Sequence, residues 1–503
     1  MKNSKYIAID NNQSIQLSDI PTLSYTAFYI TNIDLLNENT ALHCVNYFGY
    51  KLADDQIRLI CCIADDDTRK ILISSTLVTT SEKLESMTAQ KGVFEKFERE
   101  IDENFGINYT DHPWLKPVRY PSNRANQDSC INNYPFFNID SHDLHEVGVG
   151  PIHAGIIEPG HFRFICNGEQ IIHLEIQLGY QHRGIEQLFL QKQSLLQHTC
   201  LAETIAGDTV IGHTTAFVNL WESLCQIETS HETYFARTLA LELERVAIHT
   251  GDLAAICGDM AYQLGNAVYG RLRTPIINFF QEWCGNRLAK GIIRVGYTNY
   301  PFTEHLTTRL NEILISYERD FDEISHKLLS LPSALSRMEK TGELSYEDAL
   351  EIGVVGMSAR ASGLTRDIRL THPFNLYPQL THIPIIKNHG DVYSRAQIRY
   401  EEIKQSIAYI KTLIANIPSP KPKPERQLSP SENTFVISLV EGWRGEICHC
   451  VVTNEKGEPL IYKIKDPSFH NWLALAQAVR NNEISDFPLC NKSFNLSYCG
   501  HDL

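Results

Sequence analysis

Histidines, acidic residues and arginines gather in a few short segments of this chain. A histidine can give or take a proton near neutral pH, and a buried carboxyl group with a raised pKa can relay one. Arginines beside such groups supply fixed positive charge. The segments are GPIH (150–153), HRGIE (182–186), SARASGLTRD (358–367) and GDVYSR (390–395).

The 13 cysteines do not form a metal-binding pattern. There is no CxxC pair, and an odd, irregularly spaced set argues against a disulfide framework. The closest pairs are Cys61-Cys62 and Cys448-x-Cys450. We expect the members of each pair to point in different directions from their strands and to be core thiols.

Length and charge exclude several classes of protein. A chain of 503 residues is too long for one ordinary core, so we expect two or three domains. The net charge of −15 argues against a nucleic-acid partner. No apolar run is long enough for a membrane helix, and the first residues do not form a signal peptide. These features predict a cytosolic chain that touches a membrane only through other proteins.

The pattern of the first part predicts a small α+β domain over residues 1–121. Its β-rich runs include TAFYITNI (26–33) and DQIRLICCIAD (55–65), and VFEKFEREIDENFGI (93–107) has helical spacing. Residues 122–145 are polar and rich in Asn, which predicts a linker.

The rest, residues 146–503, is predicted to be mainly a helical bundle with peripheral β segments. A hairpin is expected at Asn167-Gly168, and long helices dominate residues 186–416. Residues 417–433 are rich in Pro, Ser and Lys, so we expect a surface loop inside this domain. The fold class is therefore α+β, with a small mixed domain before a helical one.

Five segments, taken in order, carry a resemblance that composition cannot. They are similar to the large subunit of energy-converting, membrane-bound [NiFe] hydrogenases of the formate-hydrogenlyase type. They also resemble its relative, the D-type subunit of respiratory complex I. FEREIDENFGI and HPWLKPVRYP resemble the end of the C-type subunit, which is fused to the large subunit in formate-hydrogenlyase proteins. The five segments are VGPIHAGIIEPGHFRF, LGYQHRGIEQL, RLAKGIIRVGYT, GMSARASGLTRDIRLTHP and HGDVYSRAQIRYEEIKQSI.

The resemblance explains the stretch LAETIAGDTVIGHTTAF (201–217), which has no obvious redox residue. Nickel-containing relatives carry an RxCGxC motif here and a DPCxxC motif near the C-terminus, and the four thiolates hold nickel and iron. In this chain none of the four ligand positions holds a cysteine, and Cys499 lies one residue before the last of them. We call these positions the substituted centre: Ala206, Thr209, Ser497 and Gly500.

Alanine and glycine have no donor atom, and neutral hydroxyl groups are poor ligands for these metals. The resemblance therefore implies no metal bound by this chain. The alternative is that small residues such as Ala206 and Gly207 only allow two helices to approach.

Three residues receive roles from the resemblance. Glu186 matches a glutamate that passes protons from the metal site, and the family match aims it at that cavity; the alternative is a surface or cap partner. Arg183 matches an arginine beside the terminal iron–sulfur cluster of the neighbouring subunit, or forms a structural salt bridge. His153 lies on a loop that reaches into the quinone cavity of complex I. Here Ala154 and Ile157 depart from the GPxHPxxH pattern of that loop.

Other residues match the cavity wall with a scaffold role as the alternative. His213 corresponds to the histidine after the first metal motif. The remaining matches are Arg360, Arg366, Asp367, Asp391 and Arg395.

The resemblance implies a nickel-free redox subunit of a membrane-associated complex. A neighbouring small subunit of the complex I B type would carry a [4Fe–4S] cluster and pass electrons to a quinone or another acceptor. A membrane-embedded subunit of the H type and antiporter-like subunits would couple this step to ion movement. The chain would then lie at the inner face of the cell membrane.

Two alternatives remain open. The chain could be a redox-inactive scaffold that transmits conformational change to the membrane arm. It could instead be a hydrogenase-4 or formate-hydrogenlyase component, in the extreme case with metal held by Cys499 and His213 alone.

Overall fold

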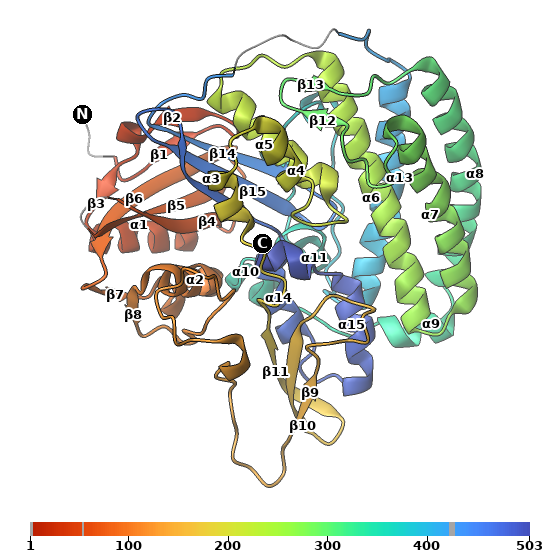
Figure 1. Ribbon diagram of the computed structural model, residues 1–503. Coiled ribbons are helices and arrows are strands. Elements are labelled where there is room, and N and C mark those ends of the chain that lie inside the picture. Colours follow the sequence, from red (N-terminus) through yellow and green to blue (C-terminus); the bar gives the residue numbers. More distant parts are fainter. Residues whose placement is uncertain (1–3, 53–54, 422–427) are drawn as a thin grey trace.

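The computed structural model describes residues 4–52, 55–421 and 428–503 (Figure 1). The first domain and the long helices lie on opposite sides of the molecule. The strands of the C-terminal part lie between them, and a small sheet projects below (Figure 1).

The first domain is built on a five-stranded sheet in which β6, β5 and β4 are antiparallel neighbours. Successive side chains of a strand point to opposite faces, and both faces of this sheet are covered. Cys61 packs in the core that contains helices α1 and α2, whereas Cys62 packs in the core that contains the C-terminal strands. The elements are β1 (Ile7–Ile9), β3 (Thr22–Leu23), α1 (Tyr25–Glu38), β4 (Leu42–Lys51), β5 (Gln56–Asp65), β6 (Lys70–Thr79) and α2 (Glu95–Phe105).

One predicted strand is wrong. The run TAFYITNI (26–33) lies in helix α1, although its β-branched and aromatic residues favour a strand. Ser24 caps this helix by accepting a hydrogen bond from the backbone N–H of Ala27. Phe28 and Leu35 then bury their side chains in the core beside α2. The N-cap and the tertiary packing outweigh the local propensity.

The C-terminal strands are a second correction, because they are central and not peripheral. β14 (Thr434–Glu441) and β15 (Glu446–Thr453) are buried along their whole length. β16 (Pro459–Lys465) pairs with β15, and β2 (Ser14–Gln16) pairs with β14. A strand from the start of the chain therefore completes the C-terminal sheet. Apolar residues on both faces of β14 and β15 are typical of strands covered on two sides.

The same sheet corrects the expectation for one cysteine pair. Residues two apart in a strand share a face, so Cys448 and Cys450 point the same way. Their Sγ atoms lie 3.7 Å apart, and Asn46 donates toward both of them. Both thiols are buried, as predicted for core cysteines.

The helical part contains the long helices that the sequence predicts. α6 is buried along most of its length, and α8 buries one face. Both patterns agree with the apolar spacing of the sequence. The bundle consists of α5 (Val210–Leu224), α6 (His231–Asp259), α7 (Gln263–Cys284), α8 (Glu304–Leu328) and α13 (Val392–Ile414).

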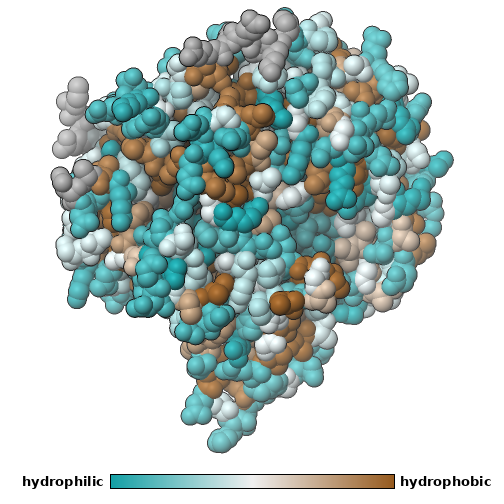
Figure 2. Space-filling model, in the orientation of Figure 1, coloured by the Kyte–Doolittle hydropathy of each residue, from teal (hydrophilic) through white to brown (hydrophobic). Residues whose placement is uncertain are grey.

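The projecting sheet consists of β9 (His145–Val149), β10 (His161–Asn167) and β11 (Gln170–Gln177). Gly168 has a φ of +57° in the predicted hairpin turn. Apolar surface is visible on this lobe in Figure 2. The loop between β9 and β10 contributes Ile152 and Ile156, which are more than four-fifths exposed.

The other helices and strands are shorter, and they include Glu186, Arg360 and Gly500. Residues 122–145 contain one 3₁₀ turn, Ile131–Asn133, and residues 422–427 of the expected 417–433 loop lie outside the described residues. Within the described ranges, no helix has the length and apolar character needed to cross a bilayer. The short elements are β7 (Lys83–Glu85), β8 (Asn108–Thr110), α3 (Ile185–Gln191), α4 (Leu195–Ala202), β12 (Ile293–Arg294), β13 (Tyr297–Thr298), α9 (Pro332–Met338), α10 (Tyr346–Glu351), α11 (Gly356–Ala361), α12 (Ile368–Thr371), α14 (Ser468–Ala478), α15 (Phe487–Phe494) and α16 (Tyr498–Asp502).

Candidate functional site

Two arginines join the segments that form the substituted centre. Arg183 donates to the carbonyl oxygens of Thr204 and Ile205 at 2.7 Å, and to that of Cys499 at 3.3 Å. Arg444 donates to Thr209 Oγ1 at 3.1 Å and to the carbonyl oxygen of Asn495 at 2.5 Å. The C-terminal tail therefore returns to residues 204–209.

Arg444 is the residue that sequence reasoning missed. It lies in the turn between β14 and β15, and its side chain is 3% exposed. Its guanidinium pairs with the Asp208 carboxylate at 2.6 Å and stacks 4.0 Å from the centre of the Trp443 ring. Burial acts to raise the pKa of Asp208, but Arg444 outweighs it and lowers this pKa. The available signal was an arginine in the turn EGWRGEI between two mostly apolar strands.

The side chains of the substituted centre do not fit a nickel–iron group. A Cβ atom at Gly500 would lie 2.7 Å from the Asp466 carboxyl carbon, so this position has no room for a cysteine. Ser497 Oγ accepts the backbone N–H of Gly500 and caps α16. The cationic Arg444 guanidinium beside Thr209 would also repel a metal cation.

His213 lies in a buried chain of hydrogen-bonding groups beside this centre. Its Nε2 is 3.0 Å from Asp466 Oδ2, and its Nδ1 is 3.1 Å from His449 Nε2. His449 Nδ1 is in turn 2.9 Å from the Tyr462 hydroxyl. A carboxylate only accepts, so with neutral imidazoles every donor in this chain points toward Asp466.

The ionisation of this chain is asymmetric. Burial, and then the neighbouring His213, holds the pKa of His449 well below its usual range. Burial acts to raise the pKa of Asp466, but His213 and Arg444 outweigh it and lower this pKa. The groups form a continuous hydrogen-bonded path from Tyr462 to a carboxylate. Both ring nitrogens of His213 are engaged, so it is not a free metal ligand together with Cys499.

The structure places Glu186 against strand β16. It lies in the first turn of α3 and accepts the backbone N–H of Ile464 at 2.8 Å. Its carboxylate is 3.1 Å from Lys463 Nζ and is 25% exposed. Among the described residues, its hydrogen-bond partners lie on β16 and not at the substituted centre. Its aim at the former metal cavity stays a prediction.

Glu186 lines a cavity of about 410 Å³ between the first domain, α3 and β16. Lys463 Nζ, which pairs with Glu186, also lies 2.5 Å from the Glu100 carboxylate. Arg119 pairs with the same Glu100 carboxylate. Tyr462 also lines the cavity. The hydrogen-bonded path from Tyr462 to Asp466 therefore connects this cavity with the substituted centre.

Two groups near the cavity ionise close to neutral pH. Burial raises the pKa of Asp502 to about 7. The Asp502 carboxylate accepts hydrogen bonds from the backbone N–H groups of Gly179 and Gln181, which lower its pKa but do not outweigh burial. Burial lowers the pKa of Lys96 to about 8. Buried groups poised in this range can exchange protons at physiological pH.

His153 folds back onto its own loop. Its Nε2 donates to the carbonyl oxygen of Gly160 at 2.8 Å. Gly150 has a φ of +89°, and a Cβ atom there would lie 2.2 Å from the same oxygen, so the turn requires glycine. The loop reaches the substituted centre through Glu158, whose carboxylate accepts the backbone N–H of Cys499 at 3.2 Å.

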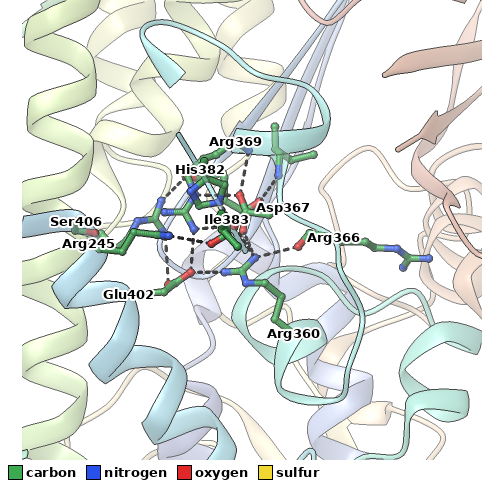
Figure 3. A network of polar contacts seen from close by, with 12 residues as sticks. Arg245, Arg360, Arg366, Asp367, Arg369, His382, Ile383, Glu402 and Ser406 are labelled. Atoms are coloured by element: carbon green, nitrogen blue, oxygen red, sulfur yellow. Dashed lines mark hydrogen bonds and ion pairs between the residues drawn. The ribbon is translucent and has the colours of Figure 1, made fainter. Parts of the chain in front are cut away.

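The remaining predicted residues lie in packed positions and not along an open wall. Arg360 and Asp367 are fully buried in an ionic network (Figure 3). The side chain of Arg366 extends away from that network (Figure 3). Asp391 caps α13 by accepting the backbone N–H of Ser394 at 2.7 Å, and Arg395 donates to Ser493 Oγ at 2.8 Å.

Several known proteins are similar in sequence to this chain. Residues 265–435 and 425–502 match the family described as the respiratory-chain NADH dehydrogenase 49 kDa subunit. The resemblance inferred from the five segments is confirmed. The chain is 26% identical over 387 residues to hydrogenase-4 component G of Escherichia coli, covering 77% of this chain and 67% of that protein.

Two further relatives represent both sides of this group. Formate hydrogenlyase subunit 5 of Escherichia coli is 27% identical over 389 residues, which are 76% of this chain and 68% of that protein. The C/D fusion subunit of NADH-quinone oxidoreductase from Phocaeicola vulgatus is 28% identical over 459 residues, which are 83% of this chain and 86% of that protein. The relatives are thus subunits of oxidoreductase complexes.

Proposed function

We propose that this chain is a nickel-free subunit of a complex-I-like or hydrogenase-like oxidoreductase. The observation that carries the proposal is the Arg444–Asp208 pair, which lies between segments that would otherwise supply four thiolates. The names of the relatives support membership of an oxidoreductase complex. The substituted ligand positions support a role without nickel.

In this proposal, electrons come from a [4Fe–4S] cluster in a neighbouring B-type subunit. They pass to a quinone or another acceptor at the face shared with that subunit. Exposed Arg183, which holds both motif segments, suits the position beside the partner's cluster. A membrane-embedded H-type subunit and antiporter-like subunits couple the step to ion movement, with this chain at the inner face of the membrane.

This chain would contribute proton transfer. Adding an electron to a poorly solvated site is costly unless a proton follows. The hydrogen-bonded path from Tyr462 through His449 and His213 ends at Asp466, beside the substituted centre. Glu186 and Lys463 supply ionisable groups in the cavity behind Tyr462.

A scaffold role is the second candidate, and two observations favour it. Arg183 binds only backbone carbonyl oxygens among its hydrogen-bond partners in the described part of the chain. Arg444 is buried between the two motif segments and holds them together. Both arginines would serve a subunit that transmits conformational change without redox chemistry.

The substitution Glu186→Gln distinguishes the two candidates. Gln keeps the shape and can still meet the backbone N–H of Ile464, but it cannot carry a proton. We expect the intact complex to assemble and its turnover to fall by about 10²–10⁴-fold, the usual loss for acid–base function. The measurement is reduction of a water-soluble quinone by the purified complex. Gln187→Glu, beside it on α3, is the control for a change of charge in the same cavity.

Unchanged turnover in Glu186→Gln would remove this residue from proton transfer. Loss of assembly would instead support the scaffold role, in which Glu186 only joins α3 to β16.

A further inference from the structure

A second polar cluster lies buried between α6, α13 and the end of β14, outside the proton path described above. Figure 3 shows its arginines and carboxylates pointing toward one another. Their side chains are at most 1% exposed. We call this cluster the Glu441 network: Arg245, Arg360, Arg369, Glu242, Asp367, Glu402 and Glu441.

The formal charges of the Glu441 network do not balance. It contains three guanidinium groups and four carboxyl groups. Two histidines face it: His249 Nε2 is 2.8 Å from Glu402, and His382 Nε2 is 3.0 Å from Asp367. Burial lowers the pKa of both histidines, which favours their neutral forms.

Neighbouring charges do not supply the missing cation. Arg399 is already paired with Asp252 at 3.0 Å. Arg366 presents its carbonyl oxygen to Arg360, while its guanidinium points away (Figure 3). A fully ionised network would therefore bury one uncompensated negative charge, which costs several kcal/mol. One added proton removes this charge.

The contacts identify which carboxyl group takes that proton. Glu402 has three guanidinium partners, at 2.7 Å from Arg360, 2.9 Å from Arg369 and 3.8 Å from Arg245. Among the described residues, Glu441 has one guanidinium partner, Arg360, at 2.9 Å, and its Oε2 accepts the backbone N–H of Ile368 at 3.1 Å.

The other two carboxylates are also better compensated than Glu441. Asp367 lies 2.7 Å from Arg369 and 3.4 Å from the same Arg360 nitrogen that Glu441 uses. Glu242 lies 3.5 Å from Arg245 and 3.8 Å from Arg369, and accepts from the hydroxyl groups of Tyr377 and Ser406.

The pKa values agree with this ranking. Burial, and then the Asp367 charge, raises the pKa of Glu441 to about 7. Burial also acts to raise the pKa of Glu402, but its arginine partners outweigh it and hold it well below the usual range. The pKa of Asp367 and that of Glu242 are lowered as well, by Arg369 and Arg245 above all.

We propose that the Glu441 network is a buried proton-binding site whose exchangeable proton resides on Glu441. The site is joined to the substituted centre through the turn after β14. Arg245 donates to the carbonyl oxygens of Glu441 and Gly442, at 2.9 and 3.1 Å. Arg444 follows two residues later and pairs with Asp208. Proton binding at Glu441 therefore acts on the strand end that positions Arg444, whether or not electrons reach this centre.

The site predicts how stability depends on pH. The pKa of Glu441 is about 7 in the folded chain and 4.5 for an ordinary glutamate, so the unfolded chain ionises first. Between these two pH values the folded chain binds more protons than the unfolded chain, and its stability falls as pH rises. A side chain at position 441 that cannot ionise would avoid this loss.

The test compares Glu441→Gln with Glu446→Gln in the intact complex, and Gln at position 441 mimics the protonated carboxyl group. We expect Glu441→Gln to leave the unfolding temperature of this subunit nearly unchanged at about pH 5 and to raise it at about pH 8.5. Glu446 lies on the next strand and pairs with Lys465 and His43, so Glu446→Gln should lower the unfolding temperature at both pH values.

A loss of stability in Glu441→Gln at both pH values would overturn the proposal, because Glu441 would then be an ordinary ionised partner of Arg360. Loss of the pH effect in His382→Gln, with the effect kept in Glu441→Gln, would place the proton on His382 and overturn the assignment.

If the complex does not assemble with Glu441→Gln, the variant Asp367→Asn tests the proposal instead. Removing the Asp367 charge lowers the pKa of Glu441. The upper end of the pH range over which the complex loses stability should then move to lower pH. An unchanged range would overturn the proposal.

Discussion

The substituted centre and the Glu441 network are both polar and buried, but their charges are arranged differently. At the centre the buried cation Arg444 pairs with Asp208, and Asp466 accepts a hydrogen bond from His213. The network has four carboxyl groups for three guanidinium groups. A paired site holds segments together, whereas an unbalanced site can bind and release a proton. The chain thus separates a structural role at the former metal position from proton binding nearby.

Breaking the network at its best-compensated member should have the largest effect. Glu402→Gln leaves Arg360 and Arg369 without their shared carboxylate, and all three side chains are buried. We expect a loss of about 3–5 kcal/mol in the free energy of unfolding, as for other broken buried ion pairs. Chemical denaturation of the full chain measures it.

The neighbouring residue on α13 supplies the control. Glu401 is 39% exposed and pairs with Lys387, so Glu401→Gln should cost at most about 1 kcal/mol. An equal loss in the two variants would contradict the importance of burial in the network.

Breaking the pair at the substituted centre should have a smaller effect. Arg444→Gln removes the partner of Asp208, whose side chain is 37% exposed, so water screens part of the interaction. We expect a loss of about 2 kcal/mol in the free energy of unfolding, below that of a fully buried pair. The same denaturation experiment measures it.

A surface pair is the matched control for Arg444. Arg337 is 42% exposed and pairs with Asp486, so Arg337→Gln should change stability by less than about 1 kcal/mol. If Arg444→Gln is as mild as Arg337→Gln, Arg444 does not hold the two motif segments together.

The sequence predicts much of this fold because hydrophobic periodicity is local. The long helices α6 and α8 and the β10–β11 hairpin follow from apolar spacing and turn residues. Helix α1 does not, because its strand-like composition is overruled by the Ser24 cap and by packing against the sheet. The central position of β14 and β15 depends on contacts with β2, more than 400 residues away in sequence.

The candidate site is only partly visible in the sequence. Comparison with the two ligand motifs of the relatives locates Ala206, Thr209 and Ser497, because each motif is short and local in sequence. The cavity that Glu186 lines depends on residues of the first domain, which motif matching does not include. Arg444 and the partners of Glu441 come from distant segments, and their charge balance exists only in three dimensions.

The metal content of the intact complex tests the central claim most directly. The complex would be purified from cells grown with nickel, and nickel and iron would be measured per copy of this chain. All four ligand positions lack a thiolate, and Gly500 has no room for one. We therefore predict iron from the partner's cluster and no stoichiometric nickel. About one nickel per chain would contradict the account.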